Sequence, residues 1–352
     1  MSNYWPVGNL DAIPKTSEIT ATLIISLRNE SENISRLVLA IMGITYPKIE
    51  IILVDDHSED ETFRKLQQSF AGFEQIKTLS NPGKGKKAAI DYAISVSKGE
   101  IILTSDADCF WESSWVERIL QNFEDPNIRL VAGPVLPKQG EGLLSRFQLI
   151  EWASILLVTN FGFGIHKPIT CSAANLAYRR TAFEDVGGFQ GNEKNPSGDD
   201  EFLLKKIVAK FGATSVLYRP YKEYLVFTEP EANWKALIFQ KIRWAGKWKS
   251  HASFSHMAFS LIPFIFQLVW LSTFLFLFEG KIGFLTFSLL WSFKILAESL
   301  AFQRILRSLE YPFRLADVVK TSLIHPFYVV GIGMGILTGK YTWKGRGNRR
   351  SD

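Results

Sequence analysis

Apolar runs alternate with helical patterns over residues 21–106. The last run begins with Ile101, Ile102 and Leu103 and shows no apolar/polar alternation, which is typical of a parallel strand buried on both faces. Four such runs and the three helical patterns between them lie, in order, at residues 21–27, 32–42, 49–56, 60–70, 76–79, 86–96 and 101–106. This order predicts an α/β domain with a parallel sheet and right-handed crossovers.

The pattern changes after residue 130. Residues 131–255 are less regular and richer in glycine and aromatic residues. Residues 152–165 carry no aspartate, glutamate, lysine or arginine but are too few to span a bilayer comfortably, so a buried or interfacial helix is expected there. Near residue 240, Gln240, Arg243 and Trp244 share one helix face, and the opposite side carries Trp234, Ile238 and Ala245. An amphipathic helix is therefore predicted, and lying on a membrane surface is one role open to it.

The last third contains three long apolar segments. Residues 257–278 contain no acidic or basic side chain, and their length suits a transmembrane helix, as does that of residues 321–339. Residues 282–302 are also apolar but carry Lys294 and Glu298, which are spaced to pair on one helix face. A core helix of a soluble protein is the alternative for each segment.

Basic residues on both sides of the last apolar segment create a conflict. Arg304, Arg307, Arg314 and Lys320 assign the loop before it to the cytoplasm, and the basic tail after it belongs there as well. One crossing cannot satisfy both, so we expect either a re-entrant segment, interrupted at Gly331, Gly333 and Gly335, or a different assignment of another segment.

Charge and cysteine content narrow the class of protein. The chain has 40 Lys and Arg against 35 Asp and Glu, a net charge of +5. Its two basic clusters border apolar segments, which favours an anionic membrane surface over nucleic acid as the partner. Two cysteines do not make a disulfide framework, and the N-terminus lacks the pattern of a signal peptide. A reduced, cytoplasm-facing catalytic region is therefore expected.

Polar clusters follow three of the predicted strands, at residues 28–30, 55–56 and 106–108. Ligands of such sheets bind at the carboxyl ends of the strands. Asp106 and Asp108 are two residues apart, so in an extended segment their carboxylates point the same way. Such a pair suits a divalent cation beside a phosphate. A solvated loop or a helix N-cap is the alternative, and an N-cap is equally an alternative for Asp199 and Asp200.

Four stretches in this order resemble one family: VDDHSEDET (54–62), SDAD (105–108), SGDDEFLL (197–204) and QKIRW (240–244). They are similar to the motifs of inverting, family 2 glycosyltransferases with a GT-A nucleotide-sugar fold and a C-terminal membrane region. YTWKGR (341–346) also resembles the end of many membrane-attached members. The implied organisation is a lead-in (1–20), a nucleotide-sugar-binding half (21–130), an acceptor-side half (131–255), a transmembrane region (256–340) and a basic cytoplasmic tail (341–352).

The resemblance also implies a role for each motif. Asp56 would accept a hydrogen bond from uracil, and His57 stands where glycine is frequent. Lys86, in competition with two neighbouring lysines, would bind the diphosphate. Asp108 would ligate Mg or Mn, with Asp106 assisting at the ribose or the metal, and Asp200 would be the general base. The remaining implied site residues are Gln240, with Arg243 at the diphosphate and Trp244 at the acceptor. Asn175 and Arg179 lie in a stretch that resembles the acceptor side, where they could form the wall of the site or serve the fold.

The sequence therefore predicts a membrane-attached, metal-dependent, inverting glycosyltransferase. Its donor would be a nucleotide sugar, with UDP as the expected nucleotide. Its acceptor would be a lipid, a lipid-linked saccharide or a growing polysaccharide, and no nucleic acid is expected as a partner. The expected setting is a bacterial-type inner membrane, crossed more than once, with the catalytic domain in the cytoplasm. The alternative is a non-catalytic nucleotide-sugar-binding sensor or assembly subunit; too few spans and no recognisable repeat argue against a transporter.

Overall fold

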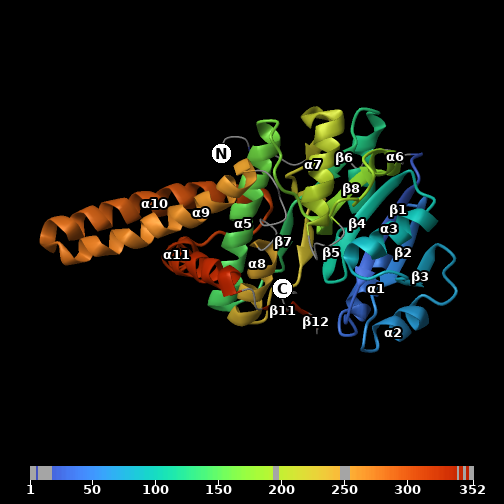
Figure 1. The fold of residues 1–352 in the computed structure, drawn as a ribbon, viewed down its shortest axis with the longest axis horizontal. Coiled ribbons are helices and arrows are strands. Elements are labelled where there is room, and N and C mark those ends of the chain that lie inside the picture. The colour runs from blue at the N-terminus through green and yellow to red at the C-terminus, as the bar shows by residue number, and fades with distance from the viewer. Residues whose placement is uncertain are drawn as a thin grey trace. The chain divides into compact units, whose positions relative to one another are not determined.

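The computed structural model of the protein describes residues 5–6, 18–192, 198–245, 254–338, 341–343 and 346–348. The chain forms two compact units (Figure 1), and each is described by itself. Unit 1 consists of Met1–Lys138, Ile155–Glu229 and Ser308–Glu310, and unit 2 of Gln139–Ser154, Pro230–Arg307 and Tyr311–Asp352.

A mixed sheet forms the centre of unit 1. Its strand order is β3-β2-β1-β4-β8-β6-β9. The strands are β1 (Ala21–Leu27), β2 (Ile49–Asp55), β3 (Ile76–Ser80), β4 (Ile101–Asp106), β6 (Leu130–Ala132), β8 (Leu176–Arg179) and β9 (Val216–Tyr218). The first four strands are parallel, as their patterns predict. β8 runs antiparallel to both β4 and β6, so the second half of the sheet does not continue the parallel order.

The parallel strands are buried on both faces. Leu23, Ile52 and Leu103 all have an exposed fraction of 0%, which explains why their runs do not alternate with polar residues. The helices of unit 1 supply apolar side chains to this core; α1, for example, contributes Leu37 and Ile41. These helices are α1 (Ile34–Met42), α2 (Thr62–Ser69), α3 (Lys86–Val96), α4 (Trp115–Leu120), α6 (Arg180–Asp185) and α7 (Asp199–Phe211).

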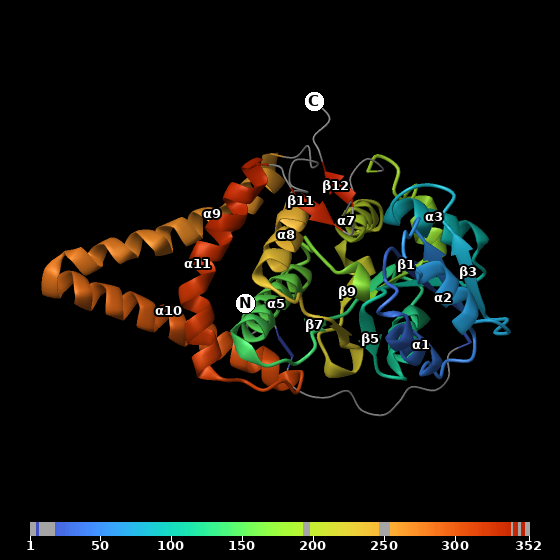
Figure 2. The same ribbon diagram turned by 90° about the horizontal axis from the view of Figure 1, so that it is seen from below.

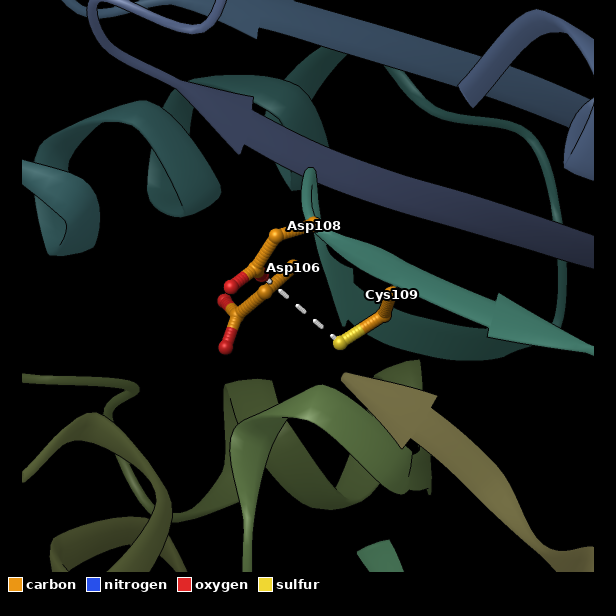
Figure 3. A group of neighbouring side chains, drawn as sticks. All are labelled: Asp106, Asp108 and Cys109. Carbon is orange, nitrogen blue, oxygen red and sulfur yellow. Dashed lines mark hydrogen bonds between the residues drawn. The ribbon is translucent and has the colours of Figure 1, made fainter. Parts of the chain in front are cut away.

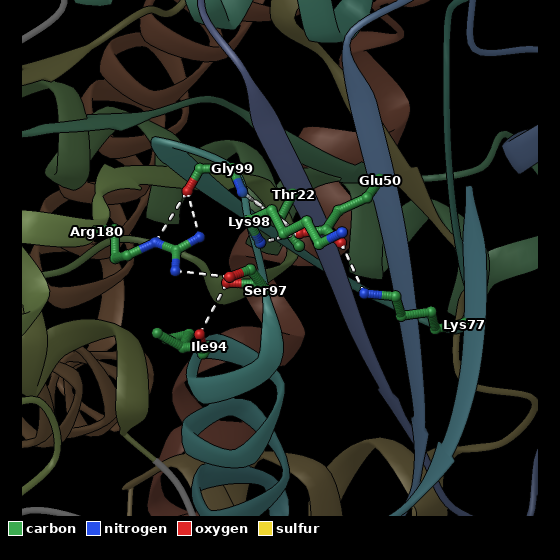
Figure 4. Close-up of polar contacts among 8 residues, drawn as sticks. All are labelled: Thr22, Glu50, Lys77, Ile94, Ser97, Lys98, Gly99 and Arg180. Carbon is green, nitrogen blue, oxygen red and sulfur yellow. Dashed lines mark hydrogen bonds and ion pairs between the residues drawn. The ribbon is translucent and has the colours of Figure 1, made fainter. Parts of the chain in front are cut away.

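A polar network closes the amino-terminal edge of the sheet (Figure 4). Glu50 of β2 accepts hydrogen bonds from Thr22 Oγ1 at 2.8 Å and from the Lys98 backbone N–H, and its carboxylate lies 3.2 Å from Lys77 Nζ. Gly99 is required beside it, because a Cβ there would lie 2.4 Å from the backbone of Ala21. The candidate site residues lie at the opposite, carboxyl-terminal edge of the sheet, where β2 and β4 end in Asp55 and Asp106.

A second, smaller sheet lies at that edge. It consists of β5 (Cys109–Trp111), β10 (Val226–Thr228) and β7 (Val135–Pro137), with β10 in the middle. The pairing of Thr228 with Cys109 brings residues far apart in the chain next to the Asp106–Asp108 segment.

Unit 2 is helical. Its helices are α8 (Trp234–Ala245), α9 (Phe254–Ser272), α10 (Gly280–Ser308) and α11 (Leu315–Thr338), with the first part of α5 (Gly142–Gly164). α9 and α10 meet at one end and diverge from there (Figure 2), and the rings of Trp270 and Trp291 join them at a centroid distance of 5.5 Å. The predicted pairing of Lys294 with Glu298 is confirmed, at 2.6 Å.

Among the described residues, three helices are long and apolar enough to cross a membrane: Gly142–Gly164, Gly280–Ser308 and Leu315–Ile336. The first begins at Gly142, so it is longer than the predicted residues 152–165, and half of its most apolar window is buried, in agreement with the buried helix expected there. The predicted segment 257–278 ends its α-helix at Ser272 and continues as a 3₁₀ helix to Phe278. Its apolar stretch among the described residues, Phe264–Phe278, is shorter than the three candidates.

The re-entrant expectation for the last segment is wrong. α11 is one continuous helix from Leu315 to Thr338, with Pro326 inside it. Two of its three glycines allow close packing instead of a turn, and Gly331 has open space at its Cβ position. A Cβ on Gly333 would lie 2.4 Å from the Phe264 ring, and one on Gly335 would lie 2.3 Å from Ile242.

Candidate functional site

Two carboxylates and a thiol meet at the end of β4 (Figure 3). One ligand atom from each of Asp106, Asp108 and Cys109 lies within 4.8 Å of the others. Thr228 Oγ1 donates a hydrogen bond to Asp108 Oδ2 at 3.3 Å, so β10 helps to orient this carboxylate. The spacing of two residues therefore brings both carboxylates into one small volume.

The donor set of this cluster suits a hard cation. The Asp106 side chain is 41% exposed, so its oxygens can be reached from solvent. Burial raises the pKa of the Cys109 thiol well above its ordinary value, and the charges of Asp108 and Asp106 raise it further. The sulfur therefore stays protonated, a weak ligand, and the carboxylate oxygens favour Mg²⁺ or Mn²⁺ over thiolate-binding metals.

Lys86 is the lysine that reaches these carboxylates. It is the first residue of α3, and its Nζ lies 2.6 Å from Asp106 Oδ1 and 3.6 Å from Asp199 Oδ2. Burial alone would lower the pKa of Lys86, but the charges of Asp106 and Asp199 outweigh it and raise the pKa above its ordinary value. Lys87 instead donates to the Asn192 carbonyl at 2.8 Å, and Lys84 is exposed. Of the three competing lysines, Lys86 has the position to meet a phosphate here.

Asp56 anchors the loop before α3. Its Oδ1 accepts hydrogen bonds from Asn81 Nδ2 and from the Gly85 backbone N–H, both at 2.8 Å. The turn contact at the end of β2 comes from its neighbour Asp55, because Asp55 Oδ2 accepts a hydrogen bond from the Ser58 N–H at 3.1 Å. The role of Asp56 at a nucleobase stays a prediction.

Arg28 fixes the neighbouring loop. Its guanidinium donates to the carbonyls of Asp56 at 2.9 Å and His57 at 2.5 Å, and pairs with Glu59 at 2.8 Å. His57 has φ +57°, a left-handed conformation that favours glycine. This explains physically why glycine is the residue to expect there, and His57 offsets the cost with a 2.7 Å contact from Nε2 to the Gly83 carbonyl.

Asp199 and Asp200 begin α7. Gly198 precedes them with φ +83° and is the N-cap residue, so neither aspartate is the cap that the alternative proposed. Carboxylates in a first helical turn are stabilised by the helix dipole. Asp200 Oδ2 accepts a hydrogen bond from the Ala173 N–H at 3.1 Å, and Asp199 is buried beside Lys86.

Asn175 and Arg179 serve the fold, which settles the alternative that their sequence leaves open. Asn175 has an exposed fraction of 0%, and its Nδ2 donates to the carbonyls of Pro134 and Tyr224. Arg179 is buried and donates to the carbonyls of Ile128 and Phe123. Both side chains tie strands and loops together.

The predicted residues of α8 lie in unit 2. Gln240 Nε2 donates to Glu231 Oε1 at 2.7 Å, and Trp244 packs edge-on against Trp152 at a centroid distance of 5.5 Å. Arg243 is half-buried. Trp234 and Ile238 pack against the core of this unit, which consists of Phe147, Leu237, Ile242, Tyr328 and Ile332. The side chain of Ala245 lies outside the described residues.

Asp199 and Thr228 are the site contacts that sequence reasoning missed. The sequence offers Asp199 only as a helix cap, whereas its approach to Lys86 joins α3 to α7 across more than a hundred residues. Thr228 reaches Asp108 through strand pairing. Neither contact has a local sequence signal.

Unit 1 also has a polar cavity of about 560 Å³ away from the residues described above. It is lined by Arg118, Gln121, Asn122, Glu124, Asp125, Ile128, Leu217, Arg219 and Tyr224. No residue that the sequence assigns to the site lines this cavity. The carboxylate cluster therefore has the stronger claim to chemistry.

Comparison with known proteins finds the same family that the sequence motifs resemble. Residues 22–187 match the model of glycosyl transferase family 2. The chain is 28% identical over 196 residues to the glycosyltransferase AglE of Haloferax volcanii, covering 55% of this chain and 63% of AglE. It is 24% identical over 204 residues to a poly-beta-1,6-N-acetyl-D-glucosamine synthase of Staphylococcus aureus, covering 53% of this chain and 50% of that protein. The chain thus spans about half to two thirds of these relatives.

A solved structure supports the fold. The mannosyltransferase PcManGT from Pyrobaculum calidifontis, in complex with GDP-Man and Mn²⁺, is similar with a TM-score of 0.56 and 18% identity, covering 96% of this chain and 92% of that chain. At this identity the likeness shows the fold alone. The predicted fold class, an α/β GT-A domain followed by apolar C-terminal helices, is confirmed.

Proposed function

We propose that this chain, whose residues 22–187 match the model of glycosyl transferase family 2, is a membrane-attached, inverting glycosyltransferase. Its donor is a nucleotide diphosphate sugar, with UDP as the predicted nucleotide. Its acceptor is a lipid, a lipid-linked saccharide or a growing polysaccharide. The observation that carries the proposal is the convergence of Lys86 with Asp106 and Asp199 where β4, α3 and α7 meet, at the edge where α/β sheets bind ligands.

The proposed reaction is a single displacement. Asp200 takes the proton of the acceptor hydroxyl while that oxygen forms a bond to the anomeric carbon. The bond from this carbon to the diphosphate breaks, and its electron pair leaves on the diphosphate oxygen. Attack from the opposite side inverts the configuration, and no covalent enzyme intermediate is needed.

The other groups bind and orient the donor. The Lys86 ammonium, at the start of α3, suits the negative diphosphate, which a helix N-terminus also favours. Asp108 and Asp106 would hold Mg²⁺ or Mn²⁺, which offsets negative charge on a departing diphosphate. The Mn²⁺ in PcManGT supports a divalent cation in this class. From the resemblance of the QKIRW motif alone, Gln240 is assigned to the donor, Arg243 to its diphosphate and Trp244 to the acceptor.

The membrane part of the proposal rests on the apolar helices. α10 exposes Ile282, Phe284, Leu285, Leu289, Phe293, Leu296 and Leu300. Such a surface suits lipid better than water. An acceptor carried in or on the bilayer fits this setting, as does a cytoplasmic catalytic domain at a bacterial-type inner membrane.

The test is transfer by the detergent-solubilised protein with Mn²⁺, across UDP and GDP sugars and a lipid extract. We expect release of nucleotide from one donor, and a fall of about 100- to 10,000-fold in Asp200→Asn, because a general base contributes about that much. Binding of the nucleotide sugar should persist in this variant. The matched control is Asp185→Asn, since Asp185 is paired with Lys210 on the surface of unit 1.

Two outcomes would overturn the proposal. Equal transfer by wild type and Asp200→Asn would remove the assigned base. Absence of transfer by the wild type on every donor, with UDP binding intact, would favour the non-catalytic binder.

A further inference from the structure

Lys86 touches the carboxylate that the metal is expected to use. Its Nζ is 2.6 Å from Asp106 Oδ1, and the Lys86 side chain is 25% exposed. The second acidic partner, Asp199, is 3.6 Å away and its side chain is only 9% exposed. One ammonium therefore lies between an open carboxylate of β4 and a buried carboxylate of α7.

A lysine ammonium and a divalent cation on the same carboxylate repel each other. At separations near 4 Å this repulsion is appreciable even in water, and it grows where solvent is partly excluded. A nucleotide diphosphate changes the balance, because its oxygens attract both cations. The buried Asp199 offers the ammonium a partner that does not belong to the Asp106, Asp108 and Cys109 cluster.

We propose that Lys86 and Asp199 couple the divalent cation to the nucleotide. Lys86 competes with the cation for Asp106, so the cation binds tightly only together with the diphosphate. Asp199 is a positioning residue that holds the Lys86 ammonium when the cation takes Asp106. This inference rests on the proposed function, because it assumes a metal site at Asp106 and Asp108.

A static brace would behave differently from a competitor. If Lys86 only offset repulsion between the acidic side chains, its removal would loosen the cluster and weaken cation binding. If Lys86 competes, its removal strengthens binding of the cation alone. The direction of the change therefore separates the two roles.

The experiment measures Mn²⁺ binding to the full chain in detergent by electron paramagnetic resonance of free Mn²⁺, with and without UDP. We expect UDP to tighten Mn²⁺ binding to the wild type at least about tenfold. For Mn²⁺ alone, Lys86→Gln should bind about fivefold tighter, and Asp199→Asn about fivefold weaker, since one unit charge near 4 Å is worth about that factor in water. Lys86→Arg, which keeps the charge, should stay close to wild type.

The control is Lys84→Gln, the exposed lysine of the same loop, which should leave both affinities unchanged. Weaker Mn²⁺ binding in Lys86→Gln, or shifts of equal sign in Lys86→Gln and Asp199→Asn, would overturn the proposal. The transfer assay reports separately on the proposed function. If Mn²⁺ affinity shifts in opposite directions in Lys86→Gln and Asp199→Asn but no transfer is seen, the coupling stands and the proposed enzyme function is wrong. If transfer is seen but UDP does not change Mn²⁺ affinity, the enzyme function stands and the coupling is wrong.

Discussion

The two units each hold a lysine close to carboxylates, and the two groups are built differently. In unit 1, Lys86 lies between Asp106 and Asp199 with its side chain 25% exposed. In unit 2, Lys241 of α8 lies 3.2 Å from Glu151 of α5, with side chains 7% and 9% exposed. The first group has more acids than bases and meets solvent; the second is a matched pair inside a helical core.

The pKa of the two lysines moves in opposite directions. Burial dominates at Lys241 and lowers its pKa despite the charge of Glu151, whereas acidic neighbours outweigh burial and raise the pKa of Lys86. Lys241 is also covered by the rings of Trp152 and Trp244, at 5.2 and 4.2 Å. A surplus of open carboxylates suits the binding of cations, and a buried matched pair suits the joining of helices.

The largest effect is expected when a carboxylate is removed from the solvent-exposed group around Lys86 in unit 1. Asp108→Asn is expected to lower transfer and UDP-linked Mn²⁺ binding at least about 100-fold, because a metal ion supplies several kcal/mol of charge stabilisation. The melting temperature should change little, since the substitution also relieves repulsion from Asp106. Transfer assays and melting in detergent check both parts, with Asp185→Asn as the matched surface change. A large drop in melting temperature with transfer intact would make Asp108 structural.

Breaking the buried pair of Lys241 and Glu151 should instead mainly lower the stability of the protein. Lys241→Met leaves the Glu151 carboxylate buried without its cation, although Tyr328 still donates to Glu151 at 3.1 Å. The expected loss in the free energy of unfolding is about 3–5 kcal/mol. Denaturant unfolding in micelles measures it, with Lys235→Met on the exposed side of α8 as control. The double variant Lys241→Met, Glu151→Gln should regain part of the loss; a loss below about 1 kcal/mol in the single variant would mean that the pair is solvated.

Local patterns in the sequence predict the first half of unit 1 well. The strands β1 to β4 and the helices between them follow from runs long enough to show their periodicity, and a spacing of two residues aligns Asp106 with Asp108. The strands β6, β8 and β9 have only three or four residues each. Their pairing is decided by distant neighbours, so the pattern there is too short to predict it.

The same limit explains the misreadings in unit 2. Lys241 falls in a basic stretch that indicates a membrane surface, but tertiary packing buries it against Glu151. The glycines of α11 indicate an interruption, but Gly333 and Gly335 make room for Phe264 and Ile242. In both cases a partner far along the chain decides the role, and local spacing has no information about that partner.

A third lysine–carboxylate pair lies between the two extremes and should give the smallest effect. Glu50 and Lys77 are 3.2 Å apart, with side chains 15% and 37% exposed. Burial would raise the pKa of Glu50, but hydrogen bonds from the Lys98 N–H and Thr22, together with Lys77, lower it below its ordinary value of 4.5. Glu50 therefore stabilises the fold above about pH 4.5, and this contribution is lost as the pH falls through its folded pKa.

Glu50→Gln is expected to lower the free energy of unfolding by about 1–2 kcal/mol at neutral pH, the range for hydrogen bonds to a charged group. At about pH 3 the difference from wild type should shrink, because the wild-type carboxylate gains a proton as well. Denaturant unfolding at the two pH values measures this, with the exposed Glu74→Gln as control. If wild type and Glu50→Gln differ equally in the free energy of unfolding at both pH values, the charge of Glu50 contributes nothing to stability. The Glu50–Lys77 pair would then resemble neither the solvent-exposed group of Lys86 nor the buried pair of Lys241.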